Sequence, residues 1–409
     1  MNAKAMTDLP LAGVRVTDFS WIGAGSYLTK LLADLGADVI KIESSAKLDA
    51  LRVSPPFKDR IKGVNRSGYF SDRNTSKRSM TVNVKTPAGL ALIRRLVAVS
   101  DIVANNFAPG TMDKLGLGYE QLKAINPRII HIGMSMHGAA GPEANTIGYG
   151  LTIGAISGLQ YLCGSPEREP VGSGTNYPDH VPNPCHGAFA VLAALRHQRR
   201  TGLGQNIDMA QTEPMIALLA PAMIDCAVNA RDVPRAGNRS ADRAPRGVFR
   251  CCGEDRWIAI SIGTDKQWRS LCEVLGFPAD RESWRTASGR LAEQDDIEKA
   301  LAASIAAWDA SELMERLQAR GVPAGVMQTA ADVIERDPQL AHRSHWRKLA
   351  HPEMGDALHN AQPFKFARVT VGPLSAAPCL GEHTEEICRT LLGLSPQEIA
   401  DLQRNGVLS

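Results

Sequence analysis

The first hydrophobic pattern along the chain is that of a β-α-β unit. Residues 14–19 alternate between apolar and polar, as in a strand with one face buried. Within residues 26–36, leucines recur at positions i, i+3, i+4 and i+7, which is the spacing of one helix face. Residues 39–43 are again a short apolar stretch typical of a buried parallel strand. The chain therefore opens with an α/β domain.

The same alternation of strands and helices continues to about residue 230. Thr86 and Pro87 suit the N-cap and first position of a helix, and Gly202 suits the end of another. We predict a large Rossmann-like domain over residues 1–230. Its further strands are expected at 80–84, 101–104, 129–136 and 206–210, and its further helices at 86–99, 120–125, 149–162, from near His186 to Gly202, and at 213–228.

A polar linker at 231–243 precedes a second, smaller α/β domain that we predict over residues 235–345. Its expected strands are 247–251, 257–262 and 322–327, and its helices are 265–275, 296–308 and one capped by Ser311 that ends before Gly321. The C-terminal segment, residues 350–409, is expected to hold short strands near 364–369 and a terminal helix pair, 385–392 and 395–403.

Composition excludes several classes of function. The net charge of +3 is small and dispersed, and aromatic residues are few, so we expect no nucleic acid partner. The eight cysteines form no CxxC pair and no zinc-ligand spacing with histidines, so we expect no metal. The N-terminus has no signal-like apolar region, and no apolar run reaches membrane-spanning length. We therefore expect a cytoplasmic enzyme with reduced thiols and no membrane contact.

Asp179 is the strongest candidate for chemistry. It follows Pro178 and precedes a loop with two further prolines, after which an alanine-rich helix begins. A carboxylate ahead of a helix N-terminus is expected to stay ionised, and an ionised carboxylate can attack an activated acyl carbon. On residue type alone, the alternative that Asp179 only caps the helix or turns the loop stays open.

A second hypothesis comes from the glycines after the first strand. Gly23-Ala-Gly25 and the acidic Glu43 at the end of the second strand imitate a dinucleotide fingerprint. The third glycine is missing, because Leu28 takes its place. On these residues alone, a nicotinamide enzyme stays open as an alternative.

Longer motifs in the sequence are more specific than the glycines after the first strand. The chain resembles the class III CoA-transferases, which include the formyl-CoA, carnitine-CoA and benzylsuccinate CoA-transferases and share their fold with α-methylacyl-CoA racemases. The resemblance rests on Asp179, Gly187-Ala-Phe-Ala, Leu192-Ala-Ala-Leu, Arg199-Arg-Thr-Gly-Leu-Gly-Gln, Leu32-Ala-Asp-Leu-Gly-Ala-Asp-Val-Ile-Lys-Ile-Glu and Gly381-Glu-His-Thr, and so covers nearly the whole chain.

The resemblance implies roles for individual residues. Asp179 matches the family's nucleophile. A CoA thioester is then a substrate, and no permanently bound cofactor is needed. Coenzyme A is expected against Ile22, Asn106, Phe107, Lys114 and Leu115. Lys47 or Arg52 is expected to supply phosphate charge, because Ser44 stands where the formyl branch has an arginine. In relatives the C-terminal segment returns to the large domain and two subunits interlock, so we expect an interlocked homodimer, or a heteromer with a homologous subunit.

The implied reaction moves CoA from an acyl-CoA donor such as succinyl-CoA to a carboxylic acid. Gly23 and Gly150 replace a glutamine and a carboxylate of the formyl branch, which argues against formate and oxalate. We expect a larger acceptor, such as benzylsuccinate, with Arg246 and His180 as candidate ligands of its carboxylate.

Two other functions stay open beside this transfer. One is a racemase, although Tyr149 stands where racemases have a histidine, and a tyrosine with a pKa near 10 is a poor base for it. The other is a catalytically silent subunit, which the presence of Asp179 disfavours.

Overall fold

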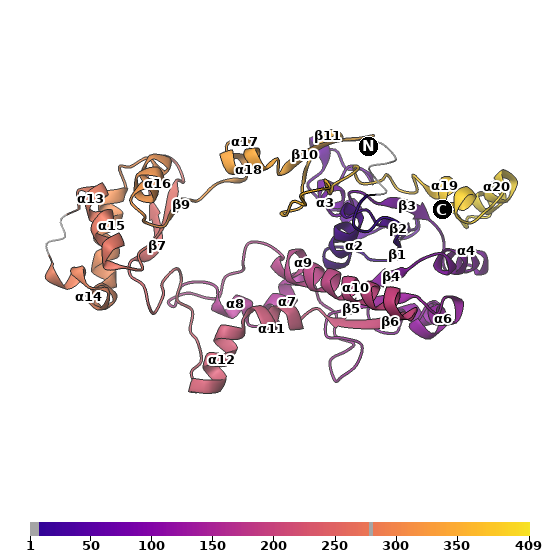
Figure 1. Ribbon diagram of the computed structural model, residues 1–409, viewed down its shortest axis with the longest axis horizontal. Helices are drawn as coiled ribbons and strands as arrows, with labels where there is room; N and C mark the ends of the chain where they lie inside the picture. The colour runs from indigo at the N-terminus through magenta and orange to yellow at the C-terminus, as the bar shows by residue number, and fades with distance from the viewer. Residues whose placement is uncertain (1–7, 278–280) are drawn as a thin grey trace. The chain divides into compact units, whose positions relative to one another are not determined.

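The computed structural model describes residues 8–277 and 281–409. Within it the chain forms two compact units. The larger unit contains the chain up to Gln160 together with Ser173–Arg231 and Gln339–Ser409. The smaller unit contains Tyr161–Gly172 and Asp232–Pro338. Figure 1 colours the chain by residue number, and the yellow C-terminal helices lie beside the indigo and violet strands of the N-terminal part.

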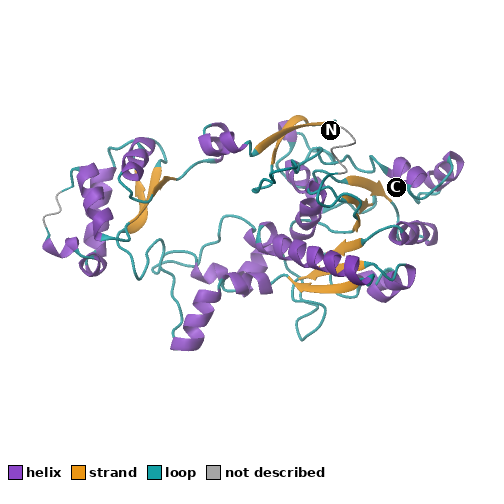
Figure 2. Ribbon diagram, viewed as in Figure 1, coloured by secondary structure: helices purple, strands orange, loops and turns teal. Residues whose placement is uncertain are grey.

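A six-stranded sheet organises the larger unit (Figure 2). Its strand order is β3-β2-β1-β4-β5-β6, and every neighbouring pair of strands is parallel. This is the order of the Rossmann fold, so the predicted Rossmann-like architecture is confirmed. The strands are β1 (Arg15–Asp18), β2 (Asp38–Glu43), β3 (Arg78–Thr81), β4 (Ile102–Asn105), β5 (Ile130–Ser135) and β6 (Gln205–Ala210).

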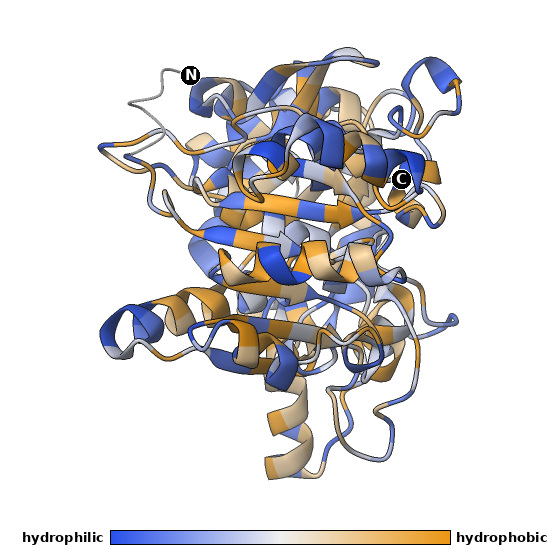
Figure 3. Cartoon of the chain, turned by 90° about the vertical axis from the view of Figure 1, so that its right-hand side faces the viewer, coloured by the Kyte–Doolittle hydropathy of each residue, from blue (hydrophilic) through white to orange (hydrophobic). Residues whose placement is uncertain are grey.

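Two long helices, α2 (Ala24–Asp34) and α10 (Pro182–Thr201), cover one face of this sheet. Leu28 and Leu32 from α2 meet Val191 and Leu195 from α10 over the apolar strand residues, which are coloured orange in Figure 3. Gly187 lets the two helices approach closely, because a Cβ there would lie 2.2 Å from Leu28 Cδ1.

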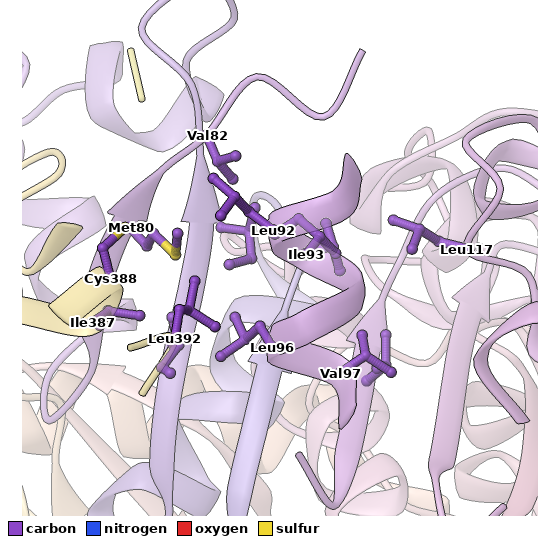
Figure 4. Packing of buried hydrophobic residues seen from close by; sticks show 14 of the residues in the cluster. Met80, Val82, Leu92, Ile93, Leu96, Val97, Leu117, Ile387, Cys388 and Leu392 are labelled. Carbon is purple, nitrogen blue, oxygen red and sulfur yellow. The ribbon is translucent and has the colours of Figure 1, made fainter. Parts of the chain in front are cut away.

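The opposite face is covered by α4 (Pro87–Ala98) and α6 (Tyr119–Ile125) and by two C-terminal helices, α19 (Thr384–Thr390) and α20 (Pro396–Arg404). Figure 4 shows the contact: Ile387, Cys388 and Leu392 of the tail pack with Met80 of β3 and Leu96 of α4. The C-terminal segment thus completes the core of the larger unit.

Shorter elements complete the larger unit. They are α3 (Gly68–Arg73), α5 (Thr111–Lys114), α7 (Gly150–Ile156), α9 (Tyr177–His180), α11 (Glu213–Leu218), α12 (Ala220–Asn229), α18 (Pro338–Arg343), the hairpin of β10 (Trp346–His351) and β11 (Gly355–Asn360), and the 3-10 turns Ala50–Val53 and Lys58–Arg60. A further short helix, α8, spans Leu159–Leu162.

The smaller unit is built on a three-stranded antiparallel sheet with the order β7-β8-β9. Its buried residues include Trp268, Leu271, Ile297 and Leu313, so helices and sheet share one core. The expected smaller α/β domain is confirmed. Its elements are β7 (Arg246–Arg250), β8 (Trp257–Ser261), α13 (Asp265–Leu275), a 3-10 turn (Glu282–Arg285), α14 (Ala287–Ala292), α15 (Gln294–Ile305), α16 (Ala310–Ala319), β9 (Ala324–Val326) and α17 (Ala330–Glu335).

Several predicted elements were wrong in detail. The helix expected over 149–162 ends at Ile156, because Gly158 adopts a φ of +90°. The helix expected over 213–228 is two helices, because Pro221 cannot continue a helix that starts before it. Asp309, not Ser311, caps α16, since its side chain accepts from two backbone N–H groups there. The described chain has no strand at 364–369.

Candidate active site

A cavity of about 780 Å³ opens at the carboxyl ends of the parallel strands in the larger unit. Its walls include Trp21 and Ile22 after β1 and Asn106 and Phe107 after β4. These two strands are neighbours at the point where the strand order reverses, which is where open α/β sheets bind ligands. Asp179 lines the same cavity.

Asp179 lies in the short helix α9, ahead of α10, and is only 6% exposed. Its Oδ2 accepts a hydrogen bond from the backbone N–H of Gly150 at 3.3 Å. Burial raises the pKa of the Asp179 carboxyl to about 6, against the opposing effects of the Gly150 N–H and the Arg73 cation. We expected a helix dipole to hold this pKa low, and burial outweighs that effect. The group is still mainly ionised at neutral pH.

Two glycines lie so close to the Asp179 side chain that neither position has room for a Cβ. A Cβ at Gly23 would lie 2.7 Å from Asp179 Cβ, and a Cβ at Gly150 would lie 2.7 Å from Asp179 Oδ2. Any side chain at either position would displace the carboxylate from its place. The glutamine and carboxylate of the formyl branch at these positions are therefore incompatible with the placement of Asp179 seen here.

Five of the predicted coenzyme-binding residues line the cavity: Ile22, Lys47, Asn106, Phe107 and Leu115. The Asn106 amide holds Trp21 through bonds to the backbone N of that residue at 2.8 Å and to its O at 2.7 Å. Phe107 meets the Trp21 ring edge to face at 5.8 Å, and Lys47 Nζ lies 5.0 Å from the ring centroid. Trp21 is thus fixed by its neighbours and belongs to the site.

Arg52 does not line the cavity, so the expectation that it supplies phosphate charge is wrong for this structure. Its guanidinium is fully buried and bonded to both carboxylate oxygens of Glu43 at 2.7 Å. It also stacks on Phe70, with 3.7 Å between the guanidinium carbon and the ring centroid. A buried, bidentate pair of this kind leaves no group free to reach a ligand.

Lys114 and His180 of the larger unit are also absent from the cavity wall. Lys114 is exposed at the end of α5. Arg246 is exposed on β7 of the smaller unit, where it lines a separate shallow hollow. His180 follows Asp179 in the chain, but its ring is engaged by other groups.

The His180 ring is held in place by two neighbours and is neutral at neutral pH. Arg73 Nη2 lies 3.0 Å from Nδ1, and Tyr69 Oη lies 3.3 Å from Nε2. Because a guanidinium can only donate, Nδ1 accepts and the ring proton is assigned to Nε2. Burial, followed by the Arg73 cation, lowers the pKa of His180 to about 4. His180 therefore carries no positive charge for a substrate carboxylate.

A buried ion pair supports the turn before Gly23. Asp49 Oδ1 accepts from the backbone N–H of Ile22 at 3.1 Å, and Oδ2 pairs with Lys41 at 2.9 Å. Ile22 adopts a φ of +57°, which is strained for a β-branched residue. The Asp49 bond stabilises this conformation, and the conformation places Gly23 against Asp179.

Sequence reasoning missed several residues of the cavity wall, and four of them bear on the chemistry of the site. They are Trp21, Lys85, Ser135 and Gln211. All four follow or end strands of the sheet: Trp21 after β1, Lys85 after β3, Ser135 in β5 and Gln211 after β6. The rule that ligands bind at carboxyl strand ends would have singled them out.

The described residues contain no group of three or more His, Cys, Asp or Glu side chains placed to hold a metal ion. In the same part of the chain, no helix combines the length and apolarity needed to cross a membrane.

A model of the family described as CoA-transferase family III matches residues 11–384. The chain belongs to this family. The class III CoA-transferase expected from the sequence is confirmed, and the turn at Gly23 is part of a CoA-transferase rather than of a nicotinamide enzyme.

Known relatives agree with this assignment. A succinate–glutarate CoA-transferase of Agrobacterium fabrum is 32% identical over 94% of this chain and 98% of its own length. The β subunit of a succinyl-CoA–L-malate CoA-transferase of Chloroflexus aurantiacus is 32% identical over 98% of this chain and 99% of its own. A probable CoA-transferase of Mycobacterium tuberculosis is 34% identical over 98% of this chain, which spans 50% of that relative's length.

A solved structure has the same fold. The CaiB/BaiF family protein from Brucella suis superposes with a TM-score of 0.86 at 35% identity, covering 94% of this CoA-transferase and 99% of the other chain.

Proposed function

We propose that this CoA-transferase moves CoA from an acyl-CoA donor to a carboxylic acid, with Asp179 as the nucleophile. One observation carries the assignment. Of the two carboxylates in the cavity wall, Glu43 is bonded to Arg52, whereas the described residues offer Asp179 only the weak Gly150 N–H as a hydrogen-bond donor. A buried carboxylate with a raised pKa and few hydrogen bonds is a stronger nucleophile than a solvated one.

The proposed first half-reaction has two displacements. The Asp179 carboxylate attacks the thioester carbon, the C–S bond breaks, and CoA leaves as a thiolate while an acyl-aspartyl anhydride forms. The thiolate then attacks the aspartyl carbonyl carbon, which breaks the anhydride C–O bond. The donor acid leaves as a carboxylate, and an Asp179–CoA thioester remains.

In the second half-reaction the acceptor carboxylate attacks the aspartyl thioester, and the same two displacements run in reverse. The new acyl-CoA leaves and the Asp179 carboxylate is restored. No net proton or electron is needed, because each bond that breaks is replaced by one of the same kind. The protein must supply orientation and stabilisation of the developing oxyanions.

The N-terminus of α2 is the proposed source of that stabilisation. This helix of 11 residues has no side-chain cap and no acidic residue in its first turn. Gly23 and Ala24 line the cavity, and Gly23 lies so near Asp179 that a Cβ on it would clash with that side chain. The first N–H groups of a helix lack partners within it and carry partial positive charge, so they suit an oxyanion formed next to Asp179.

We propose a succinyl-CoA-like donor and a dicarboxylic or substituted acceptor. Support comes from relatives whose names pair succinyl-CoA or succinate with glutarate or malate. The apolar wall formed by Met136, Ile147 and Tyr149 also suits an acyl chain as large as an aromatic succinate such as benzylsuccinate. Lys47 and Lys85 are the lining cations available for the phosphates of CoA, which is bound as a substrate.

We further propose that the working enzyme is an interlocked dimer of this chain. The apolar side chains of Phe189 on α10 and Val228 on α12 are each 74% exposed, and α12 has no buried residue. In Figure 3, α12 at the lower end is drawn mainly in hydrophobic colours. Apolar surface of this kind marks an interface, which a second copy or a homologous subunit would cover. The eight unpaired cysteines support a cytoplasmic location.

Substitution of Asp179 tests the proposed nucleophile. Asp179→Ala is expected to abolish CoA transfer while acyl-CoA binding, measured by calorimetry, persists. Asp208→Ala is the matched control, because Asp208 is exposed and does not line the cavity. Full activity of Asp179→Ala would reject the assignment.

A further inference from the structure

Ser135 and Gln211 form a polar part of the wall of the cavity that Asp179 also lines. The backbone N–H of Gln211 donates to the carbonyl O of Ser135 at 3.0 Å, so the two residues are held together where β5 and β6 end. The next residue, Met136, packs against Gly148, where a Cβ would lie 2.5 Å from its Sδ. Two residues further along, Gly150 contacts the nucleophile.

The Gln211 amide is locked in one orientation. Its Nε2 donates to the carbonyl O of Met134 at 2.7 Å, and a carbonyl oxygen can only accept. Oε1 must therefore face Asn183, whose Nδ2 donates to it at 3.3 Å. Neither amide can flip without placing two acceptors together, so Gln211 is not free to turn toward Ser135.

The Ser135 hydroxyl is left without a partner. Ser135 is 8% exposed, and its Oγ makes no hydrogen bond to any described residue. A buried hydroxyl without a partner is rare, because it has lost its hydrogen bonds to water without replacement, so such a group calls for an explanation. Because Ser135 lines the cavity, a substrate can supply the missing bond.

Charge distribution indicates which substrate group fits there. The lining cations, Lys47 and Lys85, follow β2 and β3, whereas Ser135 and Gln211 lie at β5 and β6, on the other side of the sheet order. No lining residue at this second end, within the described chain, is a cation. A substrate carboxylate would lack a counter-charge there, whereas a hydroxyl can donate to and accept from a serine.

We propose that Ser135 determines acceptor specificity by hydrogen-bonding a hydroxyl on the chain of the acceptor acid. The preferred acceptors are then hydroxylated dicarboxylic acids rather than their deoxy analogues. This inference rests on the proposed CoA transfer to an acid, and it adds a residue and a substrate class to it.

Matched acceptors that differ by one hydroxyl test the proposal. With succinyl-CoA as donor, kcat/KM is measured for glutarate against 2-hydroxyglutarate and for methylsuccinate against citramalate, using both enantiomers of each chiral acid. The wild-type enzyme is expected to favour one hydroxy acid of a pair by roughly tenfold, the contribution of one neutral hydrogen bond. Ser135→Ala is expected to remove that preference by lowering only the value for the hydroxy acid.

Ser71→Ala is the matched control, since Ser71 is also buried and its Oγ also lacks a partner, but it does not line the cavity. It should keep the preference. Ser135→Ala should not lower the thermal midpoint of the free protein, because the lost hydroxyl has no hydrogen-bond partner there among the described residues. Equal use of both acids by the wild type, or an equal loss for both acids in Ser135→Ala, would overturn the proposal. Absence of transfer to every acid would instead contradict the proposed function.

Discussion

At the scale of single residues, burial decides the behaviour of Asp179. The side chain is 6% exposed, and burial raises its pKa to about 6. The nucleophile must be deprotonated to attack. We predict that kcat/KM for the acyl-CoA donor falls about tenfold per pH unit below about pH 6 and is level above pH 7, as one ionisation requires. Initial rates in buffers of constant ionic strength measure this; a level profile down to pH 4.5 would contradict it.

The same burial predicts a gain in stability when the charge is removed. A carboxyl whose pKa is raised by folding destabilises the folded state above that pKa, and the cost vanishes below the unfolded value. Asp179→Asn should therefore be more stable than wild type by about 3 kcal/mol at pH 8 and by little at pH 4. Urea denaturation at both pH values measures the difference. Exposed Asp208→Asn should show no such gain.

At the scale of elements, α7 and the turn before α2 confine the nucleophile. Gly150→Ala would place a Cβ 2.7 Å from Asp179 Oδ2. Displacement of a nucleophile by about 1 Å costs roughly 100-fold, so we predict a loss in kcat of at least that size. Gly154→Ala is the control on the same helix, because its Cβ would come no closer than 3.4 Å to Gln160. Equal activity of the two variants would show that Gly150 does not confine Asp179.

Hydrophobic periodicity located most elements of the larger unit, because its strands are buried and its helices carry regular apolar stripes. It failed where exposure removes the pattern. The hairpin of β10 and β11 was missed, since its residues are mostly exposed or half-buried. The helix breaks at Gly158 and Pro221 were visible as residues, but whether each ends a helix depends on packing.

The sequence also indicated some residues of the candidate site and missed others. Asp179 and Phe107 follow from motifs of the family. Arg52 was misassigned, because a sequence displays a charge but not its partner, here Glu43. Ser135 was missed, since only the folded sheet brings its hydroxyl to the cavity.

At the scale of the whole molecule, the tail holds the larger unit together. Ile387 of α19 is fully buried among residues of β3 and α4 (Figure 4). Ile387→Ala should lower the free energy of unfolding by about 2–5 kcal/mol through the cavity it leaves. Neighbouring Arg389 is exposed, so Arg389→Ala should change little. Urea denaturation of both variants measures these changes. Equal unfolding midpoints for Ile387→Ala and Arg389→Ala would show that the tail is not part of this core.

The proposed dimer is a property of the same scale. Exposed Phe189 and Val228 predict that the wild type sediments as a dimer, and it should stay a dimer on dilution, because interlocked chains cannot separate without unfolding. Analytical ultracentrifugation across protein concentrations measures this. A monomeric wild type at micromolar concentration would contradict the interlocked assembly.

The central claim, that Asp179 becomes covalently acylated in each turnover, is tested most directly by trapping. The enzyme is incubated with succinyl-CoA and hydroxylamine, digested, and analysed by mass spectrometry. The account predicts a hydroxamate on Asp179 that requires the acyl-CoA and is absent from Asp179→Asn. An unmodified Asp179 in enzyme that is turning over would contradict it.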